Sequence, residues 1–395
     1  MLTHRQLFLL NIAQTSNSPR LLEIERAEGL YLYDGNGKAY MDLVSGFAVS
    51  NTGHRHPEVV QAIKDQVDLY MHLSVYGEFV QTPQVKLAQK ITSLLPSSLN
   101  SVYFVNSGTE ATEGAMKLAK RYTGRSEIIA CKNAYHGSSQ GALSLMGNEY
   151  YKQAYRPLLP GIRHIQFNEP KDLGKITPET AAVIVETIQG EAGVRVPDPE
   201  YMLLLRHKCS QTGTLLILDE IQNGMGRTGK LFAFGHFEII PDILLTAKAF
   251  GGGMPLGAFI APKHIMDALK ENPILGHITT FGGHPVCCAA GLASLDVILE
   301  ENLMAGVAEK EKLFRELLHH REIKEVRGKG LMLAVQLSNF KQVESVSKRC
   351  VENGVIVDWF LHCETALRIA PPLIISKEEI RKACEVILEA INYCS

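Results

Sequence analysis

The middle of the chain, from about residue 100 to 262, alternates short apolar runs with segments of helical polarity. This alternation is typical of a largely parallel β-sheet covered by helices. Ligands of such sheets bind beyond the carboxyl ends of the strands, so we expect the chemistry at the ends of these runs. The predicted strands read SVYFVN, EIIAC, RHIQF, AAVIVE, TLLILD, ILLTA and LGAFIA.

The flanking regions predict a smaller α/β domain that both termini build together. GLYLYDGNGKAYMDL has two alternating runs around a Gly/Asn turn, which predicts a hairpin. Helices are expected between about 57 and 95, over about 286–301, up to about 353 and from 377 onward, with strands in VRGKGLMLAVQL, VIVDWF and LRIAPPL. We therefore predict an α/β protein with a large domain over 51–282 and a small domain from 1–50 and 283–395.

Composition restricts the partners of the chain. Its 395 residues are 46% hydrophobic, enough for one large core and a smaller second one. With 40 basic and 42 acidic residues, the net charge of −2 predicts neither a nucleic-acid-binding nor a membrane-binding surface. HRQLFLLNIA faintly resembles a signal peptide but has no small-residue cleavage site, and no run approaches the roughly 18 apolar residues of a membrane span. We expect a cytoplasmic protein.

No metal site is predicted. The eight cysteines form no CxxC pair and no regular pattern, which argues against both a zinc site and a disulfide framework. His54 and His56 lie two residues apart in a Gly/Pro turn, and this is not the spacing of helical metal ligands.

Lys248 follows the apolar run LLTA and precedes three glycines. Burial lowers the pKa of a lysine toward its neutral, nucleophilic form. The alternative is a lysine that extends from a strand end into water.

An acid accompanies this lysine. Asp219 ends the apolar run TLLIL, and Lys248 ends the next predicted strand, so both should reach the same edge of the sheet. Pyridoxal phosphate requires such a pair, a lysine for the Schiff base and an acid to keep the pyridine nitrogen protonated. A structural salt bridge between the two residues is the alternative.

The segment YFVNSGTEATEG predicts a strand, a turn at Ser107, Gly108 and Thr109, and a helix. The free N–H groups at a helix N-terminus bind phosphate well. An ordinary N-cap, with Glu110 in the first turn, is the alternative.

A second glycine pattern points to a different function. Gly224, Gly226 and Gly229 have the G-x-G-x-x-G spacing of a nucleotide-binding loop, and the same stretch ends in Lys230. We do not favour this interpretation because residues 220–223 separate the loop from its strand and no clear helix follows.

Several ordered motifs carry a family resemblance. They are NSGTEA, YHG, ETIQGE, LDEIQNGMGRTG, AKAFGGGMPLGA and TTFGGHP. Together they closely resemble those of class III, fold-type I, pyridoxal-phosphate-dependent aminotransferases of the acetylornithine, ornithine and 4-aminobutyrate branch. The resemblance covers nearly the whole chain and implies pyridoxal 5'-phosphate as cofactor.

The resemblance also implies residue roles. Lys248 is similar to the Schiff-base lysine and Asp219 to the partner of the pyridine nitrogen. Gln222 matches the contact of the cofactor's phenolic oxygen, and Tyr135 matches the aromatic that stacks on the ring. Thr280 is similar to a threonine that reaches the phosphate from the other subunit of a homodimer. The other implied cofactor contacts are Ser107, Gly108, Thr109, His136 and Glu186.

For the substrate, the resemblance places Arg368 where the family binds a carboxylate and Glu191 where a glutamate can pair with that arginine. An exposed strand arginine is the alternative. The chain departs from the pattern at Ser138, where ornithine-type enzymes carry an arginine, and at Phe47, where they carry a tyrosine. These departures should relax or change the choice of amino donor.

We predict a transaminase with a ping-pong mechanism. It moves a terminal amino group from acetylornithine, ornithine or a related amino acid to 2-oxoglutarate. The alternatives are an aminomutase or decarboxylase on the same scaffold, a nucleotide-binding Rossmann-like protein and a catalytically silent binding protein.

Overall fold

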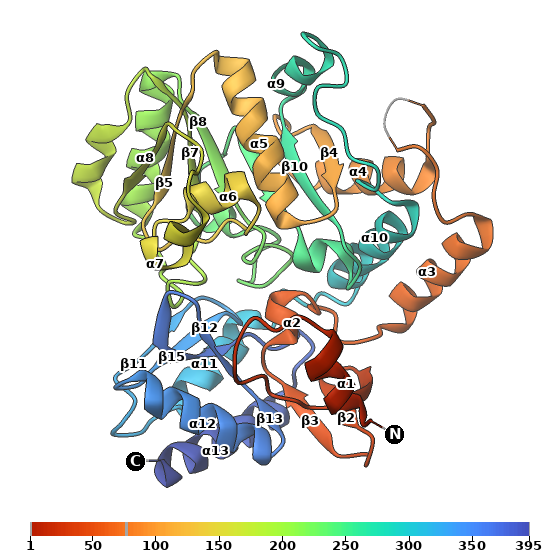
Figure 1. Ribbon diagram of the computed structural model, residues 1–395, viewed down its shortest axis with the longest axis vertical. Helices are drawn as coiled ribbons and strands as arrows, with labels where there is room; N and C mark the ends of the chain where they lie inside the picture. Colours follow the sequence, from red (N-terminus) through yellow and green to blue (C-terminus); the bar gives the residue numbers. More distant parts are fainter. Residues whose placement is uncertain (1, 76–77, 395) are drawn as a thin grey trace.

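All seven predicted strands of the middle region form one sheet (Figure 1). The computed structural model describes residues 2–75 and 78–394, and the strand order is β4-β10-β9-β8-β7-β5-β6. The strands from β9 to β6 are parallel, whereas β10 runs antiparallel to both of its neighbours. The strands are β4 (Ser101–Val105), β5 (Glu127–Cys131), β6 (Ile162–Ile165), β7 (Thr180–Glu186), β8 (Leu215–Asp219), β9 (Ile243–Thr246) and β10 (Gly257–Ala261).

Helices cover both faces of this sheet because its apolar strands present side chains alternately to each face. Ile217 packs on one face with Ala115 of helix α5 (Gly108–Thr123). Leu216, the preceding residue, belongs to the core on the other face. That second face is covered by α4 (Thr82–Ser93), α8 (Pro199–Thr212) and α10 (Pro285–Glu300).

Both ends of the chain build a second lobe, red and blue in Figure 1. The predicted hairpin is the antiparallel pair β2–β3, and β13 joins it as a parallel neighbour of β3. This lobe has two four-stranded sheets, β1-β2-β3-β13 and β11-β12-β15-β14. Its strands are β1 (Ile24–Glu28), β2 (Tyr31–Asp34), β3 (Ala39–Asp42), β11 (Glu325–Gly328), β12 (Leu333–Gln336), β13 (Val355–Ile356), β14 (Asp358–Phe360) and β15 (Cys363–Ile369), and its helices are α11 (Val307–Leu317), α12 (Phe340–Glu352) and α13 (Lys377–Tyr393).

Helix α10 connects the two lobes but packs on the larger one, against α4 and α3 (Pro57–Leu69). The division at residues 50 and 283 therefore stays a prediction. Within the described residues, no helix combines the length and apolarity needed to cross a bilayer.

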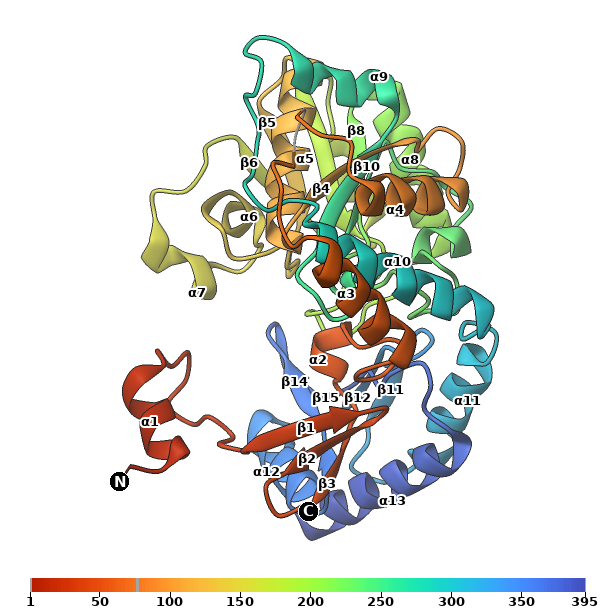
Figure 2. The same cartoon turned by 90° about the vertical axis from the view of Figure 1, so that its right-hand side faces the viewer.

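Several short helices carry too few residues for a clear apolar period, and the sequence pattern did not predict them. Helix α1 is one of these, and it stands apart from the rest of the chain in Figure 2. These helices are α1 (His4–Asn11), α2 (Ser45–Ala48), α6 (Gln140–Leu145), α7 (Glu149–Lys152) and α9 (Lys263–Met266).

Candidate active site

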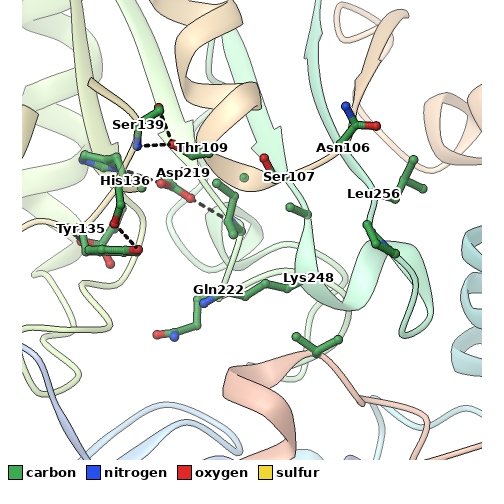
Figure 3. Close-up of a pocket in the computed structure, with 18 of the residues that line it drawn as sticks. Asn106, Ser107, Thr109, Tyr135, His136, Ser139, Asp219, Gln222, Lys248 and Leu256 are labelled. Atoms are coloured by element: carbon green, nitrogen blue, oxygen red, sulfur yellow. Dashed lines mark hydrogen bonds and ion pairs between the residues drawn. The ribbon is translucent and has the colours of Figure 1, made fainter. Parts of the chain in front are cut away.

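Parallel strands bring the predicted acid and amine to one edge of the large sheet. Asp219 is the last residue of β8 and lies in register with Glu186, the last residue of β7. Lys248 follows the end of β9 and begins a 3₁₀ turn over Lys248–Gly251. All three line a cavity of about 550 Å³, and Figure 3 shows Asp219 and Lys248 in it. The predicted site residues in its lining are Ser107, Gly108, Thr109, Tyr135, His136, Ser138, Glu186, Glu191, Asp219, Gln222 and Lys248.

Lys248 has an unusual backbone and an unusual environment. Its φ of 51° lies in the left-handed region, which costs roughly 1–3 kcal/mol for a non-glycine residue and is common at functional sites. Burial lowers the pKa of its amine, against the opposing charge of Glu191 and with the help of the Arg368 charge. The side-chain oxygen of Gln222 points toward both Lys248 and Arg368. It accepts hydrogen bonds from Lys248 Nζ at 3.1 Å and from Arg368 Nη1 at 3.2 Å. The amine is therefore held inside the site and shifted toward its neutral form.

Asp219 pairs with a histidine rather than with the lysine. His136 Nδ1 lies 2.7 Å from Asp219 Oδ2, and both side chains are buried. The other carboxylate oxygen of Asp219 accepts a hydrogen bond from the backbone N–H of Ile221 at 2.9 Å. Burial alone would lower the pKa of His136, but the hydrogen bond and charge of Asp219 outweigh burial and raise it. Both residues of the pair line the cavity.

Glu186 fixes two backbone segments in the wall of the cavity. Its carboxylate accepts hydrogen bonds from the backbone N–H of Tyr135 at 3.0 Å and of Gly190 at 2.7 Å. Burial raises the pKa of Glu186 to about 7; the nearby His136 opposes this rise and the Asp219 charge adds to it. Glu186 thus positions the backbone of Tyr135, for which the family resemblance implies stacking on the cofactor ring.

The N-terminus of α5 points its first turn at the cavity. Ser107 is the N-cap and accepts a hydrogen bond from Glu110 N–H at 3.3 Å, as the capping alternative predicted. A Cβ on Gly108 would lie 2.8 Å from Ile221 Cδ1, so a glycine fits best here. Thr109 is fixed by Ser139, with their hydroxyl oxygens 2.6 Å apart (Figure 3). Helix capping and a free positive helix end therefore coexist at this turn.

Arg368 is buried, with 3% of its surface exposed, which excludes the alternative of an exposed strand arginine. Its Nη2 lies 2.6 Å from Glu191 Oε2. Burial would raise the pKa of Glu191, but the Arg368 charge and hydrogen bond outweigh it and lower the pKa to about 2. The guanidinium carbon lies 4.4 Å from the centre of the Phe360 ring and 5.1 Å from that of Phe47. Arg368 is thus an oriented cation that lies outside the lining of the cavity and contacts it through Glu191 and Gln222.

The positions of Ser138, Phe47 and Thr280 complete the set of predicted residues. Ser138 lines the cavity, with its hydroxyl 3.1 Å from that of Tyr135. Phe47 contacts Arg368 from outside the lining and is 46% exposed. Thr280 is exposed and lies outside the lining.

The glycine-rich loop forms a contact between the lobes. It runs as turns into a 3₁₀ turn over Ala233–His236, and no α-helix begins there, so the nucleotide-loop geometry is absent from this described segment. Arg227, at its centre, is fully buried and donates to the carbonyl of Leu331 at 3.0 Å and to that of Pro371. Burial lowers the pKa of Arg227 to about 9.

The two histidines of GHRHPE each contact a carboxylate of their own. His54 Nε2 lies 2.9 Å from Asp42, and His56 Nε2 lies 3.1 Å from Glu301. In the described part of the chain, no three His, Cys, Asp or Glu residues are grouped to hold a metal ion.

Comparison with known proteins identifies the family. The model of the family described as aminotransferase class-III matches residues 12–391. The chain belongs to the class III aminotransferases. An acetylornithine aminotransferase of Methanopyrus kandleri is 40% identical over 92% of this chain and 93% of its own. That of Methanocaldococcus jannaschii is 41% identical over 89% of both chains.

Solved structures agree with this membership. The ornithine aminotransferase of Toxoplasma gondii ME49 matches with a TM-score of 0.91 and 29% identity, over 100% of this chain and 96% of its own. An omega transaminase mutant from Pseudomonas jessenii matches with a TM-score of 0.93 and 26% identity, over 100% and 99%. The predicted fold-type I α/β architecture and the predicted aminotransferase activity are confirmed.

As a class III aminotransferase, the protein uses pyridoxal 5'-phosphate, and its cavity fits this cofactor. The first turn of α5 offers N–H groups to a phosphate, and the buried carboxylate of Asp219 would suit a protonated pyridine nitrogen. Lys248 supplies an amine in the same cavity. His136 Nε2 is buried and has no hydrogen-bond partner within the described residues, as expected for a group that lies against a cofactor ring.

Proposed function

We propose that this aminotransferase moves the terminal amino group of N-acetylornithine, ornithine or a related amino acid to 2-oxoglutarate by a ping-pong mechanism. The observation that carries this proposal is the buried Arg368, which is paired with Glu191 within reach of the cavity of Lys248. The curated relatives at about 40% identity, which are acetylornithine aminotransferases, support it.

Lys248 is the proposed proton carrier. Pyridoxal phosphate, when bound, supplies an electron sink for the carbon that bears the amino group. Lys248 Nζ, whose pKa burial lowers, accepts a proton from that carbon and returns it during the transfer. The carboxylate of Asp219, hydrogen-bonded to His136 in the same cavity, would stabilise a protonated ring nitrogen.

Arg368 and Glu191 are proposed to distinguish the two half-reactions. While a terminal amine reacts, Glu191 neutralises Arg368, so the cavity does not attract an α-carboxylate there. A 2-oxo acid then competes for the same guanidinium, which binds carboxylates through two parallel hydrogen bonds. The backbone N–H of Leu361, 3.0 Å from Glu191 Oε2, remains as a partner for the displaced glutamate.

Ser138 sets the breadth of donors. The lining described for a single chain includes no arginine, and Ser138 offers a hydroxyl where ornithine-type enzymes carry a guanidinium. A donor is therefore not required to carry an α-carboxylate in a fixed position, and ω-amino acids such as 4-aminobutyrate belong to the candidate substrates.

We infer that the enzyme is a homodimer in which Thr280 completes the site of the partner. Thr280 lies in a segment that exposes apolar side chains, including Ile274 at 73%, Ile278 at 57% and Phe281 at 53%. Helix α1 is exposed along its whole length and presents Leu10 at 70%. Exposed apolar side chains grouped in this way are typical of protein interfaces.

Initial-rate kinetics test the proposal. Acetylornithine, ornithine, 4-aminobutyrate and β-alanine are each assayed with varied 2-oxoglutarate, and glutamate is measured. Parallel double-reciprocal lines with at least one donor are expected. Product that forms in many equivalents per enzyme without 2-oxoglutarate would instead identify an aminomutase or a decarboxylase. Light scattering of the holoenzyme tests the dimer, and a monomer with full activity would contradict the role of Thr280.

A further inference from the structure

A second cavity, of about 680 Å³, lies between the two lobes and is separate in its lining from the active site. On the large-lobe side it is lined by residues that follow β5, β6 and β7, among them Lys132 and Arg195. On the small-lobe side it is lined by Arg315 of α11 and by Glu325 and Arg327 of β11. We call it the interlobe cleft.

The interlobe cleft is positively charged. Arg315 is paired with Glu311 at 2.9 Å, and Arg327 with Glu325 at 3.2 Å. Among the described residues, Lys132 and Arg195 are exposed and form no ion pair. Two positive charges therefore remain outside any ion pair, although the charge of Lys132 helps to lower the pKa of Asp172.

The basic side chains are held in place by the backbone around them. Arg327 Nε donates to the carbonyl of Gly193 at 2.5 Å, across the two lobes. Arg315 Nη2 donates to the carbonyl of Gly328 at 2.8 Å. These two guanidinium groups form a fixed wall whose donors already have partners, so an anion is left to Lys132 and Arg195. The guanidinium of Arg195 matches the geometry of carboxylates and phosphates.

The loop over residues 189–195 lines both cavities, the interlobe cleft on one side and the active site on the other. Gln189 and Arg195 close this loop with two backbone hydrogen bonds of 3.0 and 2.9 Å. Glu191, between them, lines the active-site cavity and pairs with Arg368, whereas Arg195 lines the interlobe cleft. A ligand that fixes Arg195 acts on the segment that carries Glu191.

We propose that the interlobe cleft binds a small multivalent anion, a polycarboxylate or a phosphate, through Lys132 and Arg195, and that this anion changes the affinity of the active site for its 2-oxo acid. By linkage, the 2-oxo acid changes the affinity for the anion by the same factor. The binding does not depend on which amine the enzyme accepts, although its effect on the 2-oxo acid rests on the proposed role of Arg368.

Calorimetric titration of the holoenzyme with citrate and with inorganic phosphate, at constant ionic strength set with sodium chloride, tests the proposal. The double variant Lys132→Gln/Arg195→Gln should bind the preferred anion at least tenfold more weakly than the wild type. The control Lys348→Gln/Arg381→Gln removes two exposed cations from α12 and α13 and should bind like the wild type. Tighter binding of citrate identifies a polycarboxylate site, and tighter binding of phosphate a phosphate site.

Kinetics separate the interlobe cleft from the active site. If citrate competes with 2-oxoglutarate at Arg368, its effect on the kinetics persists in the double variant. If citrate acts from the interlobe cleft, its effect is lost in that variant. The proposal is overturned if the double variant binds both anions within twofold of the wild type, or if neither anion binds the wild type.

Discussion

Glu191 Oε2 lies 2.6 Å from Arg368 Nη2 and also accepts a hydrogen bond from the backbone N–H of Leu361. Because the Arg368 charge lowers the pKa of Glu191 to about 2, the carboxylate stays charged at any pH where the enzyme is assayed. The pair therefore opens through competition by a substrate carboxylate, and a change of pH above about 4 does not open it.

Glu191→Gln should free Arg368 throughout the cycle. We expect kcat/KM for L-glutamate as donor to rise at least tenfold relative to that for a terminal-amine donor, since a charge-assisted hydrogen bond contributes about 1.5–3 kcal/mol. Steady-state kinetics with both donors measure this ratio. The exposed Glu344→Gln variant serves as control and should leave the ratio unchanged. An unchanged ratio in Glu191→Gln would contradict the masking role.

Ser138→Arg should convert the donor preference. The new guanidinium would lie in the lining of the cavity and attract the α-carboxylate of ornithine or acetylornithine. We expect KM for these donors to fall about tenfold while that for an amine without a carboxylate does not improve. Ser138→Gln adds comparable bulk without charge and should not reproduce the gain. Equal changes for both kinds of donor would show that Ser138 does not face the α-carboxylate.

Asp219→Asn removes the buried charge that pairs with His136. We expect kcat to fall by about 10²–10³, as when one preorganised electrostatic contact is lost from other active sites, while the α5 turn still retains the cofactor. The measurement combines kcat with the visible spectrum of the purified variant, and the exposed Asp68→Asn variant is the control. A fall of less than threefold with cofactor bound would rule out an essential charge at Asp219.

Glu220 makes stability depend on pH. Burial raises its pKa to about 7 from an ordinary 4.5, against hydrogen bonds from Thr187 and the N–H groups of Ala233 and Phe234. The folded state therefore binds a proton that the unfolded state has released between pH 4.5 and 7, and the free energy of unfolding falls as pH rises through this window, by about 3 kcal/mol at most.

Glu220→Gln removes this titration and should flatten the fall. Denaturant unfolding at pH 5 and pH 8 measures the unfolding free energy of both proteins. Relative to the wild type, the variant should be more stable at pH 8 than at pH 5. The raised pKa of Glu186 is present in both proteins, so its contribution cancels. Parallel pH profiles for wild type and variant would contradict the raised pKa of Glu220.

The sequence predicted the strands and the edge at which Asp219 and Lys248 meet. Both predictions rest on local signals, since an apolar run predicts a strand and parallel neighbours must end at the same edge. The turn at Ser107, Gly108 and Thr109 was also predicted from a local signal, the residues that begin helix α5.

The partners of these residues could not be predicted. His136 and Asp219 are 83 residues apart in the chain, and no periodicity connects them. The hydrogen bonds of Gln222 and the burial of Arg227 likewise depend on how the lobes pack. The histidine of YHG, which lies in the loop after β5, is the one signal that could have suggested a group close to Asp219 at this edge.

The central claim is that Lys248 and its cavity carry pyridoxal phosphate through two half-reactions. The most direct test is the visible absorption spectrum of the holoenzyme while one donor at a time is added without 2-oxo acid. We predict a visible band that a donor bleaches and 2-oxoglutarate restores, and that Lys248→Ala lacks this cycle. A wild-type protein with no visible band after addition of pyridoxal phosphate, or a Lys248→Ala protein that cycles at the wild-type rate, would contradict the claim.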